Sequence, residues 1–322
     1  MLPQEKIVYP IIAGPTASGK TAAAVALAKR LNGEVISADS MQLYADVSVG
    51  TARPTQEEMQ GVPHHLTGFL PLQEKYSLAR YLEDANRVFS AVLSRGRTPV
   101  LCGGTGLYIQ SFMENRQLLE ESAQPLLRKE LLDRMQEEGA DHLLQELAQV
   151  DPQTAARLHP NDHHRIVRAL EVYYTTGMTI TQQDALSKTA PSPYTPCLFV
   201  LNFRERSRLY ERIDQRVSRM AENGLLEEAG RVLETNPEAT VTQAIGYKEL
   251  QPYFSGDCSL EAALDALRQQ TRRYAKRQLS WFRRMPQARM IYVDDYASAS
   301  LLFDAIYQQY QEFLCEEGSL CR

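Results

Sequence analysis

Eight residues near the start of the chain fill the spacing G-x-x-x-x-G-K-[ST]. They are Gly14, Pro15, Thr16, Ala17, Ser18, Gly19, Lys20 and Thr21. Glycines at the two fixed positions let backbone N–H groups turn toward phosphate oxygens, the lysine adds a positive charge, and the final hydroxyl is a ligand for Mg²⁺. The spacing therefore predicts binding of a di- or triphosphate. It leaves open which one, and whether a phosphoryl group moves.

An acidic residue, Asp39, follows the next short apolar segment of the chain. At the carboxyl end of a parallel strand, its side chain would open onto the crevice in which α/β proteins bind their ligands. There it could act as a metal ligand or as a general base. Aspartate is also a common cap of a following segment, so its position alone leaves three roles open.

Two more places in the sequence could contribute to the same crevice. Residues 103–106 (GGTG) end a strongly apolar segment, so the Thr105 hydroxyl should lie at the same sheet edge, although a Gly-Gly pair also serves as a simple tight turn. Arg212 and Arg216 are four residues apart and share one face of a predicted helix. They could stabilise charge on a leaving phosphate, or pair at the surface with acidic residues of the same helix.

Alternating strand and helix patterns would position these residues. Apolar runs predict strands at residues 6–13, 34–37 and 98–102, and Ala/Leu-rich segments predict helices at 21–31 and 77–93. This alternation is typical of an α/β fold, here a P-loop NTPase-like parallel sheet flanked by helices. Pro10 is an exception within the first strand. Because proline cannot donate to a sheet ladder, we expect the strand to be distorted or unpaired at that point.

The middle of the chain has a different character. Residues 114–162 contain eleven acidic residues against five Lys and Arg, with long helical patterns and no strand candidate. A proline-rich stretch then indicates a linker, before a strand at 198–203 and an arginine-rich helix at 207–223. We therefore expect an all-helical insertion domain at residues 114–199 within a catalytic core formed by residues 1–113 and 200–322.

The composition excludes several classes of protein. Hydrophobic residues make up 43% and charged residues 23% of the chain, which fits neither disorder nor a fibrous repeat. The apolar runs are far shorter than the roughly 18 residues of a membrane span, and the start of the sequence has no signal-peptide layout. Five scattered cysteines without a C-x-x-C pair argue against a disulfide framework or a zinc site. We therefore expect a cytoplasmic protein without a membrane partner.

Two basic blocks stand out against a formal net charge of −5. Residues 268–284 contain seven Lys and Arg and no acid, with Tyr274, Trp281 and Phe282 among them, and residues 204–219 contain six arginines against three acids. A local basic face on an acidic protein is typical of binding to a polyanion. Tyr247, Tyr274 and Trp281 could stack on bases, although core packing is the more common role for any one aromatic residue.

Several segments together resemble one family, the tRNA dimethylallyltransferases, also called tRNA isopentenyltransferases. The matching segments run in the family's order over nearly the whole chain: residues 14–21 (GPTASGKT), 37–44 (SADSMQLY), 50–54 (GTARP), 62–66 (VPHHL), 103–108 (GGTGLY), 151–173 with the core RLHPNDHHRIVRALEVY, 212–217 (RIDQRV), 243–248 (QAIGYK) and 271–281 (TRRYAKRQLSW). The phosphate loop alone is unspecific. Its conjunction with the HPND, RALE and TRRYAKRQ strings is highly specific.

The resemblance implies transfer of a dimethylallyl group from dimethylallyl diphosphate to N6 of adenine 37, in the anticodon loop of tRNAs that read codons beginning with U. The phosphate loop would then bind a diphosphate leaving group and need not hydrolyse ATP. The implied cofactor is Mg²⁺, near Thr21 and Asp39. The implied macromolecular partner is the anticodon stem-loop of tRNA, bound by a monomer.

The resemblance also implies roles for individual residues. Asp39 would be the general base on the exocyclic amine, Arg216 would neutralise the departing diphosphate, and Thr105 would contact the target nucleotide or the transferring group. Residues 14–21 would hold the diphosphate. The residues implied in tRNA binding are Asp39, Ser40, Met41, Gln42, Thr105, Arg128, His164, Arg165, Ile166, Val167, Arg168, Gly246, Tyr247, Lys248, Arg273 and Arg277.

Three other hypotheses compete with this one. A small-molecule P-loop kinase would share residues 14–21 and would turn over ATP, but it would not need the basic block at 268–284. A non-catalytic RNA-binding module would explain the basic blocks, but not a phosphate loop beside Asp39. An adenylate prenyltransferase acting on free AMP or ADP is a closer variant. The helical insertion and the basic C-terminal block favour a macromolecular acceptor instead.

Overall fold

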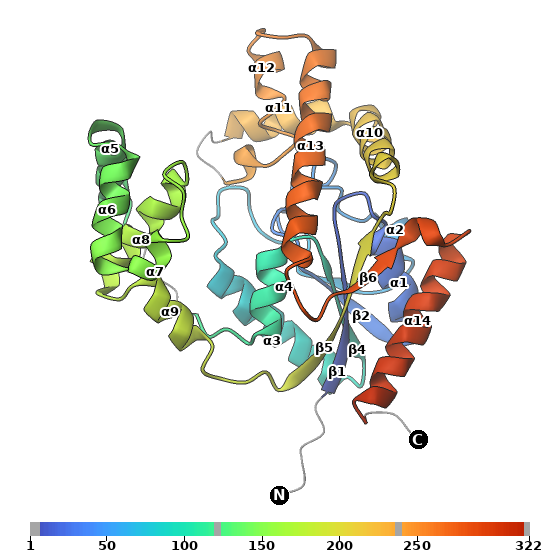
Figure 1. Ribbon diagram of the computed structural model, residues 1–322. Helices are drawn as coiled ribbons and strands as arrows, with labels where there is room; N and C mark the ends of the chain where they lie inside the picture. Colours follow the sequence, from blue (N-terminus) through green and yellow to red (C-terminus); the bar gives the residue numbers. More distant parts are fainter. Residues whose placement is uncertain (1–6, 119–123, 236–239, 319–322) are drawn as a thin grey trace, which may run out of the picture. The chain divides into compact units, whose positions relative to one another are not determined.

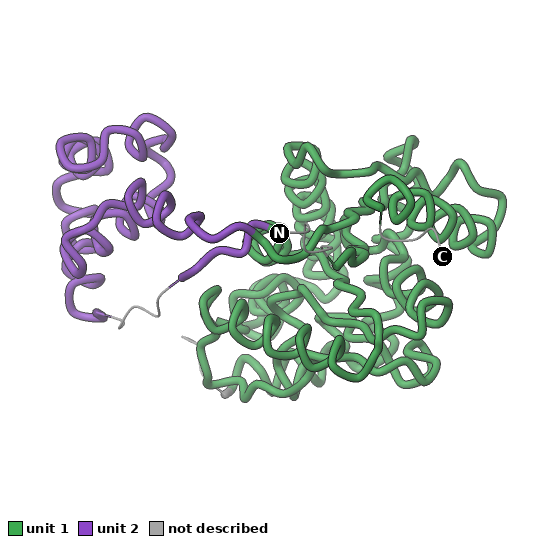
Figure 2. Tube along the Cα trace, turned by 90° about the horizontal axis from the view of Figure 1, so that it is seen from below, with its two compact units in different colours: residues 1–113, 192–322 green, residues 114–191 purple. Residues whose placement is uncertain are grey.

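A computed structural model of the protein describes residues 7–118, 124–235 and 240–318. The chain divides into two compact units: unit 1 contains Met1–Met113 and Ser192–Arg322, and unit 2 contains Glu114–Pro191 (Figure 2). The insertion predicted from the sequence extends to residue 199. That boundary is wrong, because residues from Tyr194 onward belong to a strand of the unit 1 sheet.

Among the described residues, unit 1 contains a six-stranded sheet in the order β3-β2-β4-β1-β5-β6, and its strand pairs are all parallel (Figure 1). The parallel α/β prediction is therefore confirmed. The strands are β1 Ile7–Ala13, β2 Gly33–Ser37, β3 His64–His65, β4 Thr98–Gly103, β5 Tyr194–Asn202 and β6 Arg289–Tyr292. The short strands β3 and β6 are not predicted from the sequence, because so few residues show no recognisable alternation.

Two prolines are accommodated in this sheet where a strand lacks one neighbour. The β1–β4 register begins at Ile11, so Pro10 has a strand partner only on the β5 side, opposite Cys197. The expected distortion is therefore limited to a missing partner on the β4 side. Pro196 of β5 lies opposite Tyr9 and precedes the β5–β6 register, which begins at Phe199. Proline fits a ladder position whose N–H has no strand to meet, so the end of the proline-rich stretch is strand rather than linker.

Helices cover both faces of the sheet, and the alternation along β1 shows how (Figure 1). Val8 and Ile12 belong to the core cluster that contains residues of α1 and α14, whereas the Tyr9 ring contacts Phe89 of α3 and Phe112 of α4 edge-on. The helices of unit 1 are α1 Lys20–Arg30, α2 Gln56–Met59, α3 Leu78–Ser94, α4 Gly106–Met113, α10 Arg206–Glu222, α11 Leu225–Thr235, α12 Gln251–Phe254, α13 Leu260–Phe282 and α14 Ala299–Glu316, with 3₁₀ turns at Thr240–Gln243 and Val293–Asp295.

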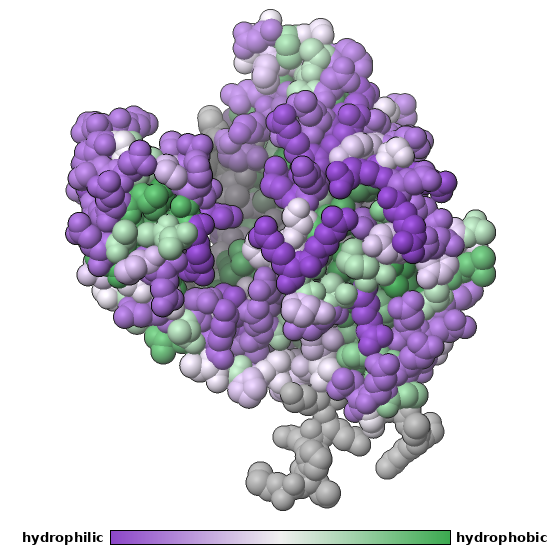
Figure 3. All heavy atoms as spheres, in the orientation of Figure 1, coloured by the Kyte–Doolittle hydropathy of each residue, from purple (hydrophilic) through white to green (hydrophobic). Residues whose placement is uncertain are grey.

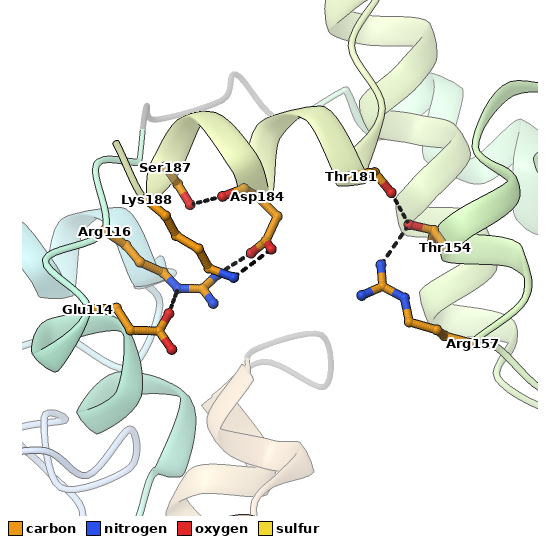
Figure 4. A network of polar contacts seen from close by, with 8 residues as sticks. All are labelled: Glu114, Arg116, Thr154, Arg157, Thr181, Asp184, Ser187 and Lys188. Carbon is orange, nitrogen blue, oxygen red and sulfur yellow. Dashed lines mark hydrogen bonds and ion pairs between the residues drawn. The ribbon is translucent and has the colours of Figure 1, made fainter. Parts of the chain in front are cut away.

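The regular elements described in unit 2 are helices, as expected for the insertion. They are α5 Pro125–Glu137, α6 Ala140–Val150, α7 Pro152–Ala155, α8 His163–Thr176 and α9 Ile180–Ser187. Their apolar faces form a separate core that includes Leu143, Leu147 and Leu170. Polar contacts fasten α9 at both ends: Asp184 pairs with Arg116 and Lys188 at 2.7 Å each, and the Thr181 and Thr154 hydroxyls are 3.3 Å apart (Figure 4).

The structure contains no helix, among the residues it describes, that is long and apolar enough to cross a membrane.

Candidate active site

The phosphate loop connects β1 to α1, as its spacing predicts. Two of its glycines are required by the backbone. A side chain at Gly14 would place its Cβ 2.6 Å from the backbone oxygen of Leu201 in β5, and Gly19, which precedes α1, has a φ of 88°. A side chain would clash at the first position and be strained at the second. The loop therefore lies close to the sheet and leads directly into the N-terminus of α1, where an anion would be stabilised.

Two polar groups in this loop lack the partner that an anion would supply. The Ser18 hydroxyl is buried and has no hydrogen-bond partner among the described residues. The Lys20 ammonium donates to the carbonyl of Pro15 at 2.6 Å, within its own loop. Burial lowers the pKa of Lys20 to about 8. A buried hydroxyl and a desolvated ammonium beside a helix N-terminus form a site that a diphosphate would satisfy.

Asp39 lies two residues beyond the end of β2, and its two carboxylate oxygens differ. Oδ1 accepts hydrogen bonds from the backbone N–H groups of Met41 at 3.0 Å and Gln42 at 3.4 Å, so the capping role that its position allowed is present. Oδ2 has no hydrogen-bond partner in the described part of the chain. One oxygen therefore orients the half-buried carboxylate, and the other is available to accept a proton.

The turn after β4 is fastened to the Asp39 segment. The Thr105 N–H donates to the carbonyl of Ala38 at 3.1 Å, and its Oγ1 accepts from the Ser40 N–H at 3.0 Å. A Cβ on Gly103 would lie 2.2 Å from the same Ala38 carbonyl, so the close approach requires glycine. The carboxyl ends of two neighbouring strands thus bring Thr105 beside Asp39, as their positions in the sequence predict.

The two arginines of α10 lie against this site. Arg212 Nε donates to the carbonyl of Ala17 in the phosphate loop at 2.8 Å. Burial lowers the pKa of Arg216, and the negative charge of Asp39 opposes that shift. Within the described residues neither arginine forms an ion pair on its own helix, since Asp214 pairs with Arg272 of α13 at 2.5 Å. Arg216 is therefore the arginine that lies near Asp39 and is partly buried, whereas Arg212 is exposed.

No group of three or more His, Cys, Asp or Glu that could enclose a metal occurs among the described residues. The residues assigned to Mg²⁺, Thr21 and Asp39, offer a hydroxyl and a carboxylate, and both side chains are half-buried. Oxygen donors in small number suit Mg²⁺, which keeps water and substrate phosphate oxygens as its remaining ligands. These two residues fit an ion that is carried largely by the diphosphate.

Some basic residues of α13 form ion pairs with acidic residues, and others do not. Arg268 pairs with Glu261 and Asp265, and Arg272 pairs with Asp214. Arg273, Lys276 and Arg277 are exposed and have no ion-pair partner in the parts of the chain that the structure describes. Hydrophilic side chains cover much of the surface over α10 and the middle of α13 (Figure 3). The cations available to a polyanion are thus fewer than the sequence count suggests.

Tyr247 does not fit its predicted role as a tRNA-binding residue that stacks on a base. Its ring is fully buried, and its hydroxyl donates to Glu228 at 2.8 Å, so the side chain cannot stack on a base. Gly246 is also buried, whereas Lys248 is exposed. The string around Tyr247 mixes apolar and polar residues, and only its contact with Glu228 of α11 shows that the tyrosine points inward.

In unit 2 the helical period separates the predicted RNA-contacting residues of α8. His164, Arg165 and Arg168 are exposed, but Ile166 and Val167 are completely buried in the unit 2 core, so assigning RNA contact to their side chains is wrong. Arg168 and Arg128, the latter on α5, also share an acid: their Nη1 atoms lie 3.2 Å and 3.0 Å from Glu171 Oε2. Both guanidinium groups remain nearly half exposed.

Glu228, a buried acid of α11, is a residue that the sequence patterns did not identify. Its carboxylate accepts from the backbone N–H groups of Ser48, Val49 and Gly50 at 2.7 to 2.9 Å, in addition to the Tyr247 hydroxyl. These contacts anchor the loop that follows Asp39. A signal was present, because Glu228 shares a helix face with the apolar residues Leu225, Ala229 and Val232, all of which are buried.

Gln278 of α13 was also missed, although it lies within the TRRYAKRQ string. Its side chain is 6% exposed and contacts both the phosphate loop and the turn after β4. A signal was present here too, because Gln278 shares a helix face with Thr271, Ala275 and Phe282, all of which are buried.

Comparison with known proteins agrees with this arrangement. The family model described as IPP transferase matches residues 42–285, and a model described as isopentenyl transferase matches residues 7–66. The chain belongs to the IPP transferase family. Its relatives include a protein named tRNA dimethylallyltransferase from Bacillus subtilis, 45% identical over 278 residues, which are 86% of this chain and 88% of the relative. One of the same name from Thermoanaerobacter is 43% identical over 289 residues, covering 89% and 92%.

Solved structures of the family have the same fold. A tRNA isopentenylpyrophosphate transferase from Bacillus halodurans matches with a TM-score of 0.72 and 39% identity, over 98% of both chains. A eukaryotic dimethylallyltransferase described as acting on tRNA matches with a TM-score of 0.78 and 28% identity, over 95% of this chain and 80% of that one. Membership of this family confirms the predicted P-loop NTPase-like fold and excludes the kinase and binding-module hypotheses.

Proposed function

We propose that this protein transfers the dimethylallyl group of dimethylallyl diphosphate to N6 of adenine 37, in the anticodon loop of tRNAs reading codons that begin with U. Prenyl transfer to tRNA is the activity of the family to which the chain belongs. The observation that carries the finer proposal is the phosphate loop bordered by Asp39 on one strand end and Arg216 on α10.

The donor half of the reaction uses cationic and backbone groups of the chain. The loop amides and Lys20 would bind the diphosphate, and Arg216 would neutralise the charge that grows as the allylic carbon–oxygen bond breaks. Thr21 would hold Mg²⁺, which would supply further positive charge to the diphosphate, while Oδ2 of Asp39 stays free of the ion. A desolvated lysine and arginine suit this role, because burial strengthens their attraction to an anion.

The acceptor half uses Asp39. The N6 amine of adenine is a weak nucleophile because its lone pair is delocalised into the ring. Oδ2 of Asp39 would accept the amine proton as the new N–C bond forms and the C–O bond breaks, while diphosphate leaves. The adenine must leave its stack to reach this position, and the Thr105 turn beside Asp39 would contact it.

The tRNA backbone would be held by exposed cations on each unit, among them Arg273 and Arg277 of α13 and Arg165 and Arg168 of α8. Such contacts to phosphates supply affinity without reading the base sequence. We expect the enzyme to act in the cytoplasm as a monomer.

A transfer assay tests the proposal directly. Dimethylallyl diphosphate labelled in the prenyl group is incubated with the protein and Mg²⁺, and unmodified tRNA, AMP, ADP and ATP are offered separately. Label in tRNA alone is the expected result, and mapping of the modified nucleotide should give adenine 37. Label in a free nucleotide would instead identify an adenylate prenyltransferase, and no transfer to any acceptor would refute the proposal.

A further inference from the structure

The amide of Gln278 joins two loops that have different tasks. Its Oε1 accepts a hydrogen bond from the Thr16 N–H in the phosphate loop at 2.9 Å, and its Nε2 donates to the Gly104 carbonyl at 2.9 Å. Both polar ends of a nearly inaccessible side chain are therefore satisfied by backbone groups. One belongs to the loop for the diphosphate, and the other directly precedes Thr105.

The Gln278 amide occupies the space that a side chain at Gly104 would fill. A Cβ at Gly104 would lie 2.2 Å from Nε2 of Gln278, and the next nearest atoms are 3.4 Å or more away. The φ of Gly104 lies outside the left-handed region that favours glycine, so the backbone conformation alone does not require glycine there. The group that a side chain at this position would displace is the Gln278 amide.

Neighbouring residues of α13 extend the same contact. Burial raises the pKa of Tyr274, one helical turn before Gln278, and the nearby side chains of Gln278 and Thr105 oppose that shift. Trp281, nearly one turn after it, lies against Gly106, where a Cβ would meet the indole ring at 2.4 Å. One face of α13 thus follows the turn at residues 104–106, and Gln278 alone of the three also reaches the phosphate loop.

We propose that Gln278 is a positioning residue, which sets the separation between the phosphate loop and the turn that carries Thr105. Given the proposed function, this separation places the reacting carbon of the donor at attacking distance from the adenine amine. Displacement by about 1 Å of groups that align two reactants costs on the order of 100-fold in rate. Because both polar ends of Gln278 already bond to the two loops, we assign it no contact with either substrate.

The first test is Gln278→Met, which keeps the length and volume of the side chain but removes both hydrogen bonds. We expect kcat to fall about 100-fold, while KM for each substrate and the Kd for tRNA change less than about threefold, because ground-state binding is retained. Ser280→Ala, at an exposed position on the same helix, should leave all of these values unchanged. Wild-type kcat in Gln278→Met would overturn the proposal.

The second test approaches the same contact from the other partner. Gly104→Ala should displace the Gln278 amide and reproduce the loss of kcat. If both changes break one link, the double variant Gly104→Ala/Gln278→Met should be little worse than either single variant. Multiplied losses would show that the two residues act separately, and would overturn the proposal.

Hydrogen exchange provides a measurement that does not depend on the acceptor. In Gln278→Met the amide of Thr16 should exchange faster than in the wild-type protein, and in Ser280→Ala it should not. If the Thr16 amide exchanges faster in Gln278→Met but the wild-type protein labels no tRNA, the proposed function is refuted, while the connection that Gln278 makes between the two loops is supported. Unchanged exchange at Thr16 would refute the link, whatever the transfer assay shows.

Discussion

Asp39 uses its two carboxylate oxygens for different purposes. Oδ1 receives backbone N–H groups from Met41 and Gln42, which fixes the orientation of the carboxylate, and Oδ2 has no protein partner among the described residues. A general base needs this combination, since a free oxygen without a fixed direction would seldom meet the amine. The capping and catalytic roles that appear as alternatives in the sequence are therefore compatible in one side chain.

The substitution Asp39→Asn separates these two roles. The introduced amide would retain an oxygen that accepts from Met41 but could not take a proton, so we expect kcat to fall by about 10²–10⁴-fold. The Kd for tRNA, measured by filter binding, should stay within about twofold. Asp46→Asn, at an exposed position in the same loop, should behave as wild type. Lost tRNA affinity with normal turnover of bound substrate would contradict the role.

Among the elements, α13 has two faces with different tasks. Tyr274, Gln278 and Trp281 contact the turn after β4, while Arg273 and Arg277 are exposed. A cation that contacts a phosphate releases counterions from the polyanion, and a cation already paired with an acid of the protein contributes less to this effect. The binding strength of this helix should therefore depend on its unpaired cations rather than on its total charge.

The double variant Arg273→Ala/Arg277→Ala tests this dependence. We expect weaker tRNA binding and a plot of log Kd against log salt whose slope falls by about 1 to 2, because up to two phosphate contacts are lost. Arg272→Ala is the matched control: its charge is already paired with Asp214, so the slope should change little. An unchanged slope in the double variant would remove these residues from the interface.

The loop after Asp39 depends on α11 for its shape. Glu228→Gln would place an amide N–H₂ group against backbone donors that now meet a carboxylate. We expect the free energy of unfolding to fall by about 1–3 kcal/mol, and amides 48–50 to exchange faster. Glu227→Gln, at the exposed neighbouring position, should leave both measurements unchanged. Equal effects of the two variants would show that the buried contacts contribute nothing specific.

At the scale of the whole molecule, the sequence of unit 1 is interrupted by unit 2, which has its own helical core, and Asp151 connects helices of that core. Its carboxylate accepts from the N–H of Thr154 at 3.1 Å and from both the N–H and the hydroxyl of Thr181. Burial alone would raise the pKa of Asp151, but these hydrogen bonds outweigh burial and hold the pKa below its usual value.

The sign of this shift predicts a pH dependence. A carboxyl whose pKa is depressed by folding contributes its stability above its unfolded pKa, about 4 for aspartate, and loses it as the pH falls through the folded value. The thermal midpoint of Asp151→Asn should therefore lie below that of the wild type at pH 7, and the difference should shrink below about pH 4. Asp141→Asn, at an exposed position, should show no such difference. A constant gap at every pH would contradict the assignment.

Patterns that are local in the chain were sufficient to predict the phosphate loop, the parallel sheet, the helical insertion and the family. Each depends on spacing, periodicity or a short string, which neighbouring residues define without help from the rest of the chain. The position of Asp39 beside Thr105 also follows from sequence, because carboxyl ends of parallel strands meet at one edge of a sheet.

Only the tertiary structure shows which residues of the family-like segments point toward the site and which are buried elsewhere. Tyr247 turned out to be buried against Glu228, Ile166 and Val167 to be in a core, and Gln278 to span two loops that lie 174 and 262 residues away in the chain. Spacing within a helix can indicate which of its residues are buried, but it cannot name their partners, because long-range hydrogen bonds arise from packing between distant segments.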